Sequence, residues 1–242
     1  GVLSILLTLA LLHPPSEKGP MAAPLIPGFE ETASEDEQFL WKIQSDSIRY
    51  FLDFSDPETG LTRDSSNPGS PASIAATGFS LAALAIGADR GWVPYSRAYD
   101  QILRTLETLQ RKAQHKNGFF YHFLDPETGR RTWKSEASSI DTALAVAGAL
   151  VAGQYFPGSR VEALAHAIYR RVNWKWMLNQ SDLVCMGWKP ETGFLPYYWD
   201  SYSEHLILQA LAIGASFEPI PAKLWNHWNR FEDEYRAKRI VY

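Results

Sequence analysis

Two kinds of hydrophobic pattern alternate along the chain, and both have helical spacing. Three segments are apolar on nearly all sides and rich in small residues, at 73–88, 138–153 and 201–215. Helices of this kind are covered by neighbours on several sides. Between them lie segments with one apolar stripe and an opposite charged face, which predicts outer helices in contact with water. These one-sided segments are 35–54, 99–113, 159–174 and about 221–236.

Outer and inner helices in strict alternation predict an all-α fold built from helical hairpins. No convincing alternating strand of useful length is present. A repeated loop, DPETG at 56–60 and 125–129 and KPETG at 189–193, comes before each inner helix. Stacked hairpins either extend as a solenoid or close into an (α/α) barrel. Because the three loops gather at one end, we favour a toroid whose loops surround one opening, called the mouth below.

About three and a half hairpins are present, which is too few for a closed ring. We therefore expect an incomplete barrel, with the inner helices exposed on the open side. Apolar positions expected to be exposed there include Leu81, Leu84 and Leu208. Large apolar patches in water favour association or unfolding.

The first residues, GVLSILLTLALLHPP, have a different character. About a dozen apolar residues are too few to span a bilayer and fit the apolar region of a secretory signal. We interpret 1–24 as a signal remnant and tether, 25–34 as a linker and 35–242 as the helical domain. This predicts a periplasmic or secreted protein without stable membrane insertion, and the alternative is a stray apolar terminus.

Composition narrows the range of partners. The 242 residues carry a net charge of -4 with no block of five like charges, which argues against nucleic acid as a partner. The one cysteine, Cys185, excludes an internal disulfide and a thiolate zinc cluster. The histidines share no ligand spacing and the DPETG loops are read as turns, so no metal or cofactor is predicted. Nine Trp, eleven Tyr and twelve Phe crowd the loops between helices, where they suit sugar stacking as well as core packing.

Carboxylates gather at the starts of two inner helices, Glu136 and Asp141 on one, Asp200 and Glu204 on the other. Ser138 to Asp141 and Ser201 to Glu204 both match the capping box, so on spacing alone these acids are first read as caps. Glycoside hydrolysis also needs two carboxyls, one to protonate the leaving oxygen and one to activate water or attack. A helix N-terminus lowers the pKa of a carboxyl whereas a general acid needs a raised pKa, so burial or a second acid would have to dominate.

The segments FYHFLDPETGRRTWKSEASSIDTALAVAGALVAGQYF and GFLPYYWDSYSEHLILQALAIGA resemble the bacterial glucoamylase-like family, which includes the endo-β-1,2-glucanases. The resemblance runs from about residue 40 to 242. It implies an (α/α)6 toroid that hydrolyses a glucan with acids at its mouth, and it maps the catalytic acids onto Asp141 and Glu204, with Glu136 as the third candidate. The family domain continues beyond this length, which predicts that 35–242 is the N-terminal part of a barrel.

Aromatic and imidazole side chains near these acids are the predicted substrate contacts. They are Tyr121, His122, Trp133, Trp188, Tyr198, Trp199 and Tyr202. For His122 a purely structural role is an equal alternative.

We therefore predict a glycoside hydrolase acting on an oligo- or polysaccharide, with β-1,2-glucan as the best guess. Adjacent inner helices pack about 8–10 Å apart, which favours the wider carboxyl spacing of an inverting enzyme. The alternative is a non-catalytic helical-repeat module that binds glucan or another protein. A polysaccharide lyase is a weaker alternative, because the mouth loops show no basic cluster.

Overall fold

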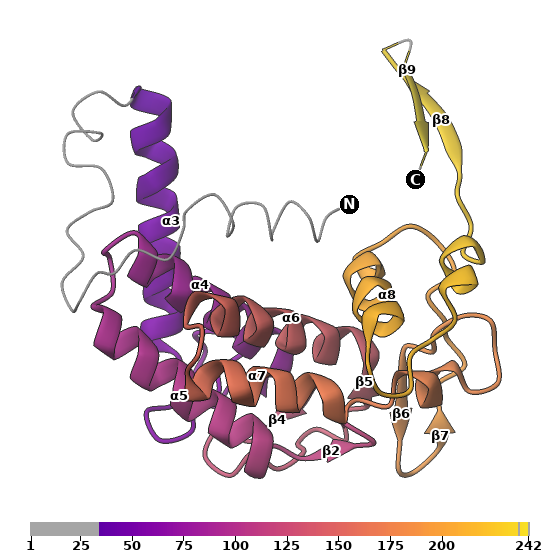
Figure 1. Cartoon of the computed structure of the whole chain (residues 1–242), viewed down its shortest axis with the longest axis horizontal. Helices are drawn as coiled ribbons and strands as arrows, with labels where there is room; N and C mark the ends of the chain where they lie inside the picture. Colours follow the sequence, from indigo (N-terminus) through magenta and orange to yellow (C-terminus); the bar gives the residue numbers. More distant parts are fainter. Residues whose placement is uncertain (1–33, 237, 242) are drawn as a thin grey trace.

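The computed structural model describes residues 34–236 and 238–241, and over this range the alternation of helices is confirmed (Figure 1). The inner helices α4, α6 and α8 follow one another along one layer, and α5 and α7 lie along the other. The fold is all-α, with helical hairpins that form part of a toroid. The helices are α3 (Glu35–Asp53), α4 (Ile74–Asp89), α5 (Tyr95–Arg111), α6 (Ser139–Tyr155), α7 (Arg160–Arg171) and α8 (His205–Gly214).

Helices α4 and α6 pack backbone against backbone because glycines face each other at their crossing. A Cβ added at Gly148 would lie 1.9 Å from the carbonyl oxygen of Gly78, and one added at Gly78 would lie 2.5 Å from the carbonyl oxygen of Leu144. Only residues without a side chain fit at this distance. The all-round apolar pattern of both helices is thus explained, since each is covered by the other and by an outer helix.

Short strands join the loops in front of the inner helices. Strand β1 (Ala72–Ser73) pairs with β4 (Phe123–Leu124), and β5 (Ala137–Ser138) pairs with β6 (Gly187–Lys189), which also pairs with β7 (Gly193–Phe194). A further pair, β2 (His115–Lys116) with β3 (Phe119–Phe120), lies between α5 and β4. These strands were not predicted, because two or three residues are too few to show an alternating pattern. They hold the N-terminal ends of α4 and α6 at one end of the molecule, as predicted.

The predicted helix at about 221–236 is wrong. The chain forms a short 3-10 helix, η2 (Ala222–Asn226), and then a hairpin of β8 (Glu232–Tyr235) and β9 (Lys238–Val241). Within this segment only Leu224 and Trp228 are buried, so the apolar stripe has nothing to pack on beyond Trp228. Arg230 donates to the carbonyls of Trp225 and Trp228, and these contacts end the turn. The outer segment at 159–174 also ends early, at Arg171, and continues as η1 (Trp174–Leu178).

The expected exposed positions on the inner helices are also wrong. Leu81 is 0% exposed, Leu84 1% and Leu208 0%, because these side chains point into the packed layer. The exposed large apolar residues of α4 are instead Phe79 and Ile86. No helix among the described residues is long and apolar enough to cross a membrane. The signal and linker predicted for 1–34 lie outside the described residues, except for Ser34, which caps α3.

Candidate active site

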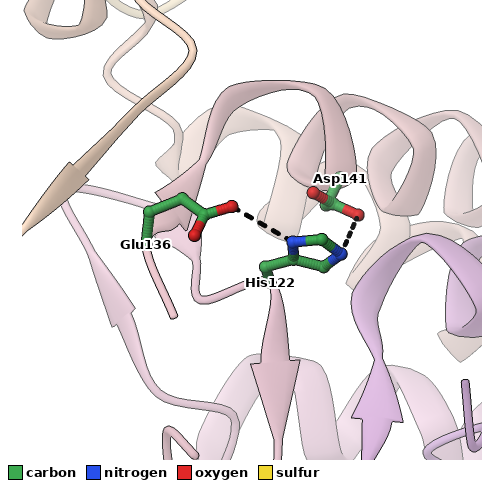
Figure 2. A group of neighbouring side chains, drawn as sticks. All are labelled: His122, Glu136 and Asp141. Atoms are coloured by element: carbon green, nitrogen blue, oxygen red, sulfur yellow. Dashed lines mark hydrogen bonds and ion pairs between the residues drawn. The ribbon is translucent and has the colours of Figure 1, made fainter. Parts of the chain in front are cut away.

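An imidazole lies between two carboxylates at the mouth (Figure 2). Nδ1 of His122 is 3.1 Å from Oε1 of Glu136, and Nε2 is 3.5 Å from Oδ1 of Asp141. His122 is about a third exposed, Glu136 about a quarter, and Asp141 is nearly buried. These three residues, called the His122 cluster below, bring together two of the three predicted catalytic acids and one predicted substrate contact.

Backbone hydrogen bonds fix the position of His122 between two inner helices. Its amide donates to the carbonyl of Glu136 at 2.9 Å, and its carbonyl accepts from the amide of Ile74 at 3.1 Å. Ile74 is the first residue of α4, and Glu136 directly precedes β5 and α6. His122 is therefore held where the starts of α4 and α6 meet.

Asp141 combines a helix-start position with a raised pKa. The hydroxyl of Ser138 accepts from the amide of Asp141 at 3.2 Å, which is one half of the predicted capping box. The carboxylate itself faces His122. Burial raises the pKa of Asp141, and this effect exceeds the lowering by the charge of His122 and by the hydrogen bond to Ser138. The effect of burial on the pKa of Asp141 therefore outweighs the lowering expected at a helix N-terminus, and a raised pKa is what a general acid requires.

The other two members of the cluster are shifted toward their charged forms. The hydrogen bond to His122 lowers the pKa of Glu136 despite partial burial. Burial alone would lower the pKa of His122, but the hydrogen bond to Glu136 and the charges of Asp141, Glu136 and Asp64 raise it overall. The cluster thus pairs an ionised Glu136 with a histidine that holds its proton more tightly than usual.

Glu204 is not a cap in the predicted sense. It is the N-cap residue of α8, makes no side-chain cap hydrogen bond and is exposed. The hydroxyl of Ser201 donates to the carboxylate of Asp200 instead. The capping-box interpretation is wrong here because α8 begins at His205, one residue after the acid that the box would place inside the helix. Glu204 lies outside the His122 cluster.

Trp199 connects the start of α8 to the start of α6. Its Nε1 donates to the hydroxyl of Ser139 at 3.0 Å, two residues before Asp141. Its ring stacks on His205, with 5.9 Å between centroids and 9° between planes. Glu204 is the residue before His205, so one aromatic ring joins the starts of the two helices that carry Asp141 and Glu204.

The predicted sugar contacts divide into covered and accessible rings. Tyr121 is 4% exposed and lies under the guanidinium of Arg131, so its ring supports the fold. Trp188 and Tyr198 are half-buried, and the hydroxyl of Tyr198 accepts from Asn179. Trp133 and Tyr202 are exposed at 66% and 54%, which leaves their rings accessible to a ligand.

Phe123 is a site residue that sequence reasoning missed. Its ring stacks on His122, with centroids 3.9 Å apart and 16° between planes, and Trp133 packs on it with centroids 5.1 Å apart. Trp133 and the next residue, Lys134, both have positive φ, a strained turn that presents the indole beside the cluster. Phe123 ends GFFYHF, but nothing in the sequence separates it from its buried neighbours. Asp64, in a polar loop, carried no signal at all.

The donor atoms of the His122 cluster all lie within 4.8 Å of one another, close enough to consider a divalent cation. A cation would need one imidazole nitrogen and both carboxylates to converge on a point. Each ring nitrogen faces a different carboxylate instead, so the arrangement fits a doubly paired imidazole better than a metal centre.

The chain is similar in sequence or in fold to proteins named as β-1,2-glucan hydrolases. A curated exo-β-1,2-glucooligosaccharide sophorohydrolase (non-reducing end) from Parabacteroides distasonis is 26% identical over 221 residues, which cover 84% of this chain and 30% of that protein. The solved structure of an endo-β-1,2-glucanase from Chitinophaga pinensis, in complex with sophorotriose and glucose, superposes with a TM-score of 0.74 at 21% identity. This match covers 86% of this chain and 56% of that one. The chain is similar to the glucoamylase-like β-1,2-glucanases.

A glucoamylase-like protein from Bacteroides uniformis has the same fold, with a TM-score of 0.77 at 23% identity over 86% of this chain and 55% of that one. No family model matches the chain. The chain spans between about a third and just over half of the length of these glucoamylase-like β-1,2-glucanases. The shared fold confirms the helical toroid.

Proposed function

We propose that the full-length protein is a glycoside hydrolase that acts on a glucan, with β-1,2-linked glucan as its substrate. The observation that carries the proposal is the His122 cluster, in which a buried acid with a raised pKa faces His122 beside an ionised one. The named activities of the relatives support the substrate class. Export remains a prediction from the first residues of the chain.

In this proposal Asp141 is the general acid. Its buried carboxyl holds a proton to higher pH than an exposed aspartate and donates it to the glycosidic oxygen as the bond to the anomeric carbon breaks. Glu136 stays ionised and keeps His122 protonated and oriented toward Asp141. The exposed rings of Trp133 and Tyr202 suit stacking on sugar faces.

Glu204 is the proposed general base. It takes a proton from a water molecule, and the resulting hydroxide attacks the anomeric carbon from the face opposite the leaving oxygen. Glu136 and Asp141 have oxygens within 4.8 Å of each other, which is shorter than the separation in an inverting pair. An inverting pair needs carboxyls about 6.5–9.5 Å apart, so the second carboxylate has to come from elsewhere on the mouth. Glu204, exposed at the start of the neighbouring inner helix, is the carboxylate that we assign to this role.

The direct test is to incubate the full-length protein with linear β-1,2-glucan and to follow the anomeric configuration of fresh product by proton NMR. We expect hydrolysis with α-configured product first, the result of inversion at a β-linkage. β-configured product would show retention and would contradict the Asp141–Glu204 pair. It would instead favour the closely spaced carboxyls of Glu136 and Asp141 as the catalytic pair. Binding without any hydrolysis would favour the non-catalytic binding module instead.

A further inference from the structure

Arg131 joins two of the repeated loops next to the His122 cluster. Its two terminal nitrogens bind both carboxylate oxygens of Glu191, at 2.6 and 2.9 Å. Arg131 follows the second loop (125–129), and Glu191 lies in the third (189–193). The hydrogen bond from Arg131 holds the pKa of Glu191 at about 2. Both side chains of the pair therefore stay charged at any pH near neutrality. The Arg131 side chain is 12% exposed, which orders it far more than an ordinary surface arginine.

The same guanidinium holds the turn that carries Glu136. Nε of Arg131 donates to the carbonyl of Ser135 at 2.5 Å. The hydroxyl of Ser135 accepts from the amide of Phe123 and donates to its carbonyl, both at 3.2 Å. Ser135 precedes Glu136, and Phe123 follows His122. Arg131 therefore acts on the backbone next to both members of the Glu136–His122 hydrogen bond.

The β6–β7 hairpin also supports Glu136, through Gly187 at the start of β6. A Cβ added at Gly187 would lie 2.7 Å from Cγ of Glu136 and 3.0 Å from the carbonyl oxygen of Ala137. The side chain of Glu136 therefore rests directly on the glycine backbone. Gly187 and Glu191 belong to one hairpin, β6–β7, so this hairpin contacts the Glu136 segment at two separate points.

We propose that Arg131 and Glu191 are a positioning pair, which locks the β6–β7 hairpin against the Glu136 turn and keeps Glu136 in contact with His122. This inference rests on the proposed function for its catalytic consequence, but its structural part does not. Neither residue lies within the His122 cluster, and neither is proposed to touch the substrate.

The direction of the change in the pKa of His122 distinguishes a displaced Glu136 from the simple loss of the charge of Arg131. Three acids face His122: Glu136, Asp141 and Asp64. His122, Lys189 and Arg131 are the charged groups that face Glu136. Loss of the positive charge of Arg131 cannot by itself lower the pKa of His122, because removal of a cation favours the protonated imidazole. Displacement of Glu136 would lower it, because the strongest stabilising hydrogen bond is lost.

The experiment is an NMR titration of the full-length protein, labelled with carbon-13 at histidine, for the wild type and Arg131→Gln. The His122 signal is assigned by its loss in His122→Gln. We expect the pKa of His122 to fall in Arg131→Gln, and kcat on β-1,2-glucan to fall by at least about tenfold with a smaller change in KM, because misplaced catalytic groups lose rate rather than binding. An unchanged or raised pKa of His122 would overturn the proposal.

Two further variants guard against misfolding and indirect effects. Gly187→Ala changes no charge but pushes on Glu136, so it should lower the pKa of His122 in the same direction. Glu107→Gln is the matched control, since it breaks the Arg160–Glu107 ion pair between α5 and α7 and should leave the pKa of His122 unchanged. Should Gly187→Ala leave the pKa of His122 as it is, the claimed support of Glu136 by the hairpin is wrong.

The two proposals fail separately. If the wild type does not hydrolyse β-1,2-glucan but Arg131→Gln still lowers the pKa of His122, the positioning pair stands and the proposed function falls. If the wild type hydrolyses the glucan and Arg131→Gln changes neither kcat nor the pKa of His122, the proposed function stands and the positioning pair falls.

Discussion

Replacement of Gly148 by alanine is the sharpest perturbation of the fold that the structure offers. The new methyl group would lie 1.9 Å from the carbonyl oxygen of Gly78, where ordinary contacts are 3.4–4 Å. Neither atom can rotate away, because the methyl carbon is bonded directly to the backbone of α6 and the carbonyl oxygen is part of the backbone of α4. Helices α4 and α6 must therefore separate by roughly 1.5 Å at their crossing, and a gap of that size removes a large part of the dispersion energy of the side chains around it.

The magnitude follows from two opposing effects. Overpacking of a core costs about 1–3 kcal/mol and sometimes more, and a backbone clash belongs at the upper end. Alanine in place of glycine within a helix returns up to about 1 kcal/mol. We therefore expect Gly148→Ala to lower the free energy of unfolding by about 2–3 kcal/mol, measured by urea denaturation of the full-length protein.

Gly153→Ala, in the same helix, is the matched control. Its nearest neighbours are Cβ of Ala165 at 3.1 Å and Cα of Glu162 at 3.3 Å, both on α7, so a shift of α7 by a few tenths of an ångström relieves the contact. The change in the free energy of unfolding should stay within about 1 kcal/mol of zero, because the propensity gain offsets a mild contact. If Gly148→Ala proves as stable as Gly153→Ala, the close crossing of α4 and α6 is wrong.

Two further predictions concern the site. Because the pKa of Asp141 is raised in the folded protein, ionisation of Asp141 above that pKa lowers the free energy of unfolding. Asp141→Asn, which cannot ionise, should therefore be at least as stable as wild type at pH 7. Urea denaturation should show this advantage shrinking toward pH 4. A clear loss of stability at pH 7 would contradict this sign. Trp133→Ala should raise KM for β-1,2-glucan by about 2–10-fold, the range of about 0.5–1.5 kcal/mol for a stacked ring, without loss of stability, since the indole is 66% exposed. An unchanged KM would remove Trp133 from the binding surface.

The helical layers could be predicted from the sequence because burial leaves a periodic mark. An all-round apolar helix such as α6 and a one-sided helix such as α5 differ in composition at every turn, and both were located to within a few residues. The segment at about 221–236 shows the limit of this reasoning. Its apolar spacing is helical, but a helix also needs a surface to pack on, and the sequence carries no record of that surface.

The candidate site was only partly predictable for a similar reason. Glu136 and Asp141 stand out as acids at the start of an apolar helix, and the structure brings both to His122. Phe123 and Arg131 have ordinary identities, and only their contacts, which come from distant loops, connect them to the cluster. For Glu204, the helix starts at His205 and not at Tyr202, as a capping box from Ser201 requires, and the carboxylate is left exposed.

The most direct test of the account is the hydrolysis of linear β-1,2-glucan by Glu204→Gln in the full-length protein. Glutamine keeps the size of the side chain but cannot take a proton from water, so kcat should fall by at least about a hundredfold, the lower range for general acid–base catalysis. The free energy of unfolding should stay unchanged, since the Glu204 side chain makes no cap hydrogen bond. Wild-type hydrolysis by Glu204→Gln would contradict the proposed pair of acids.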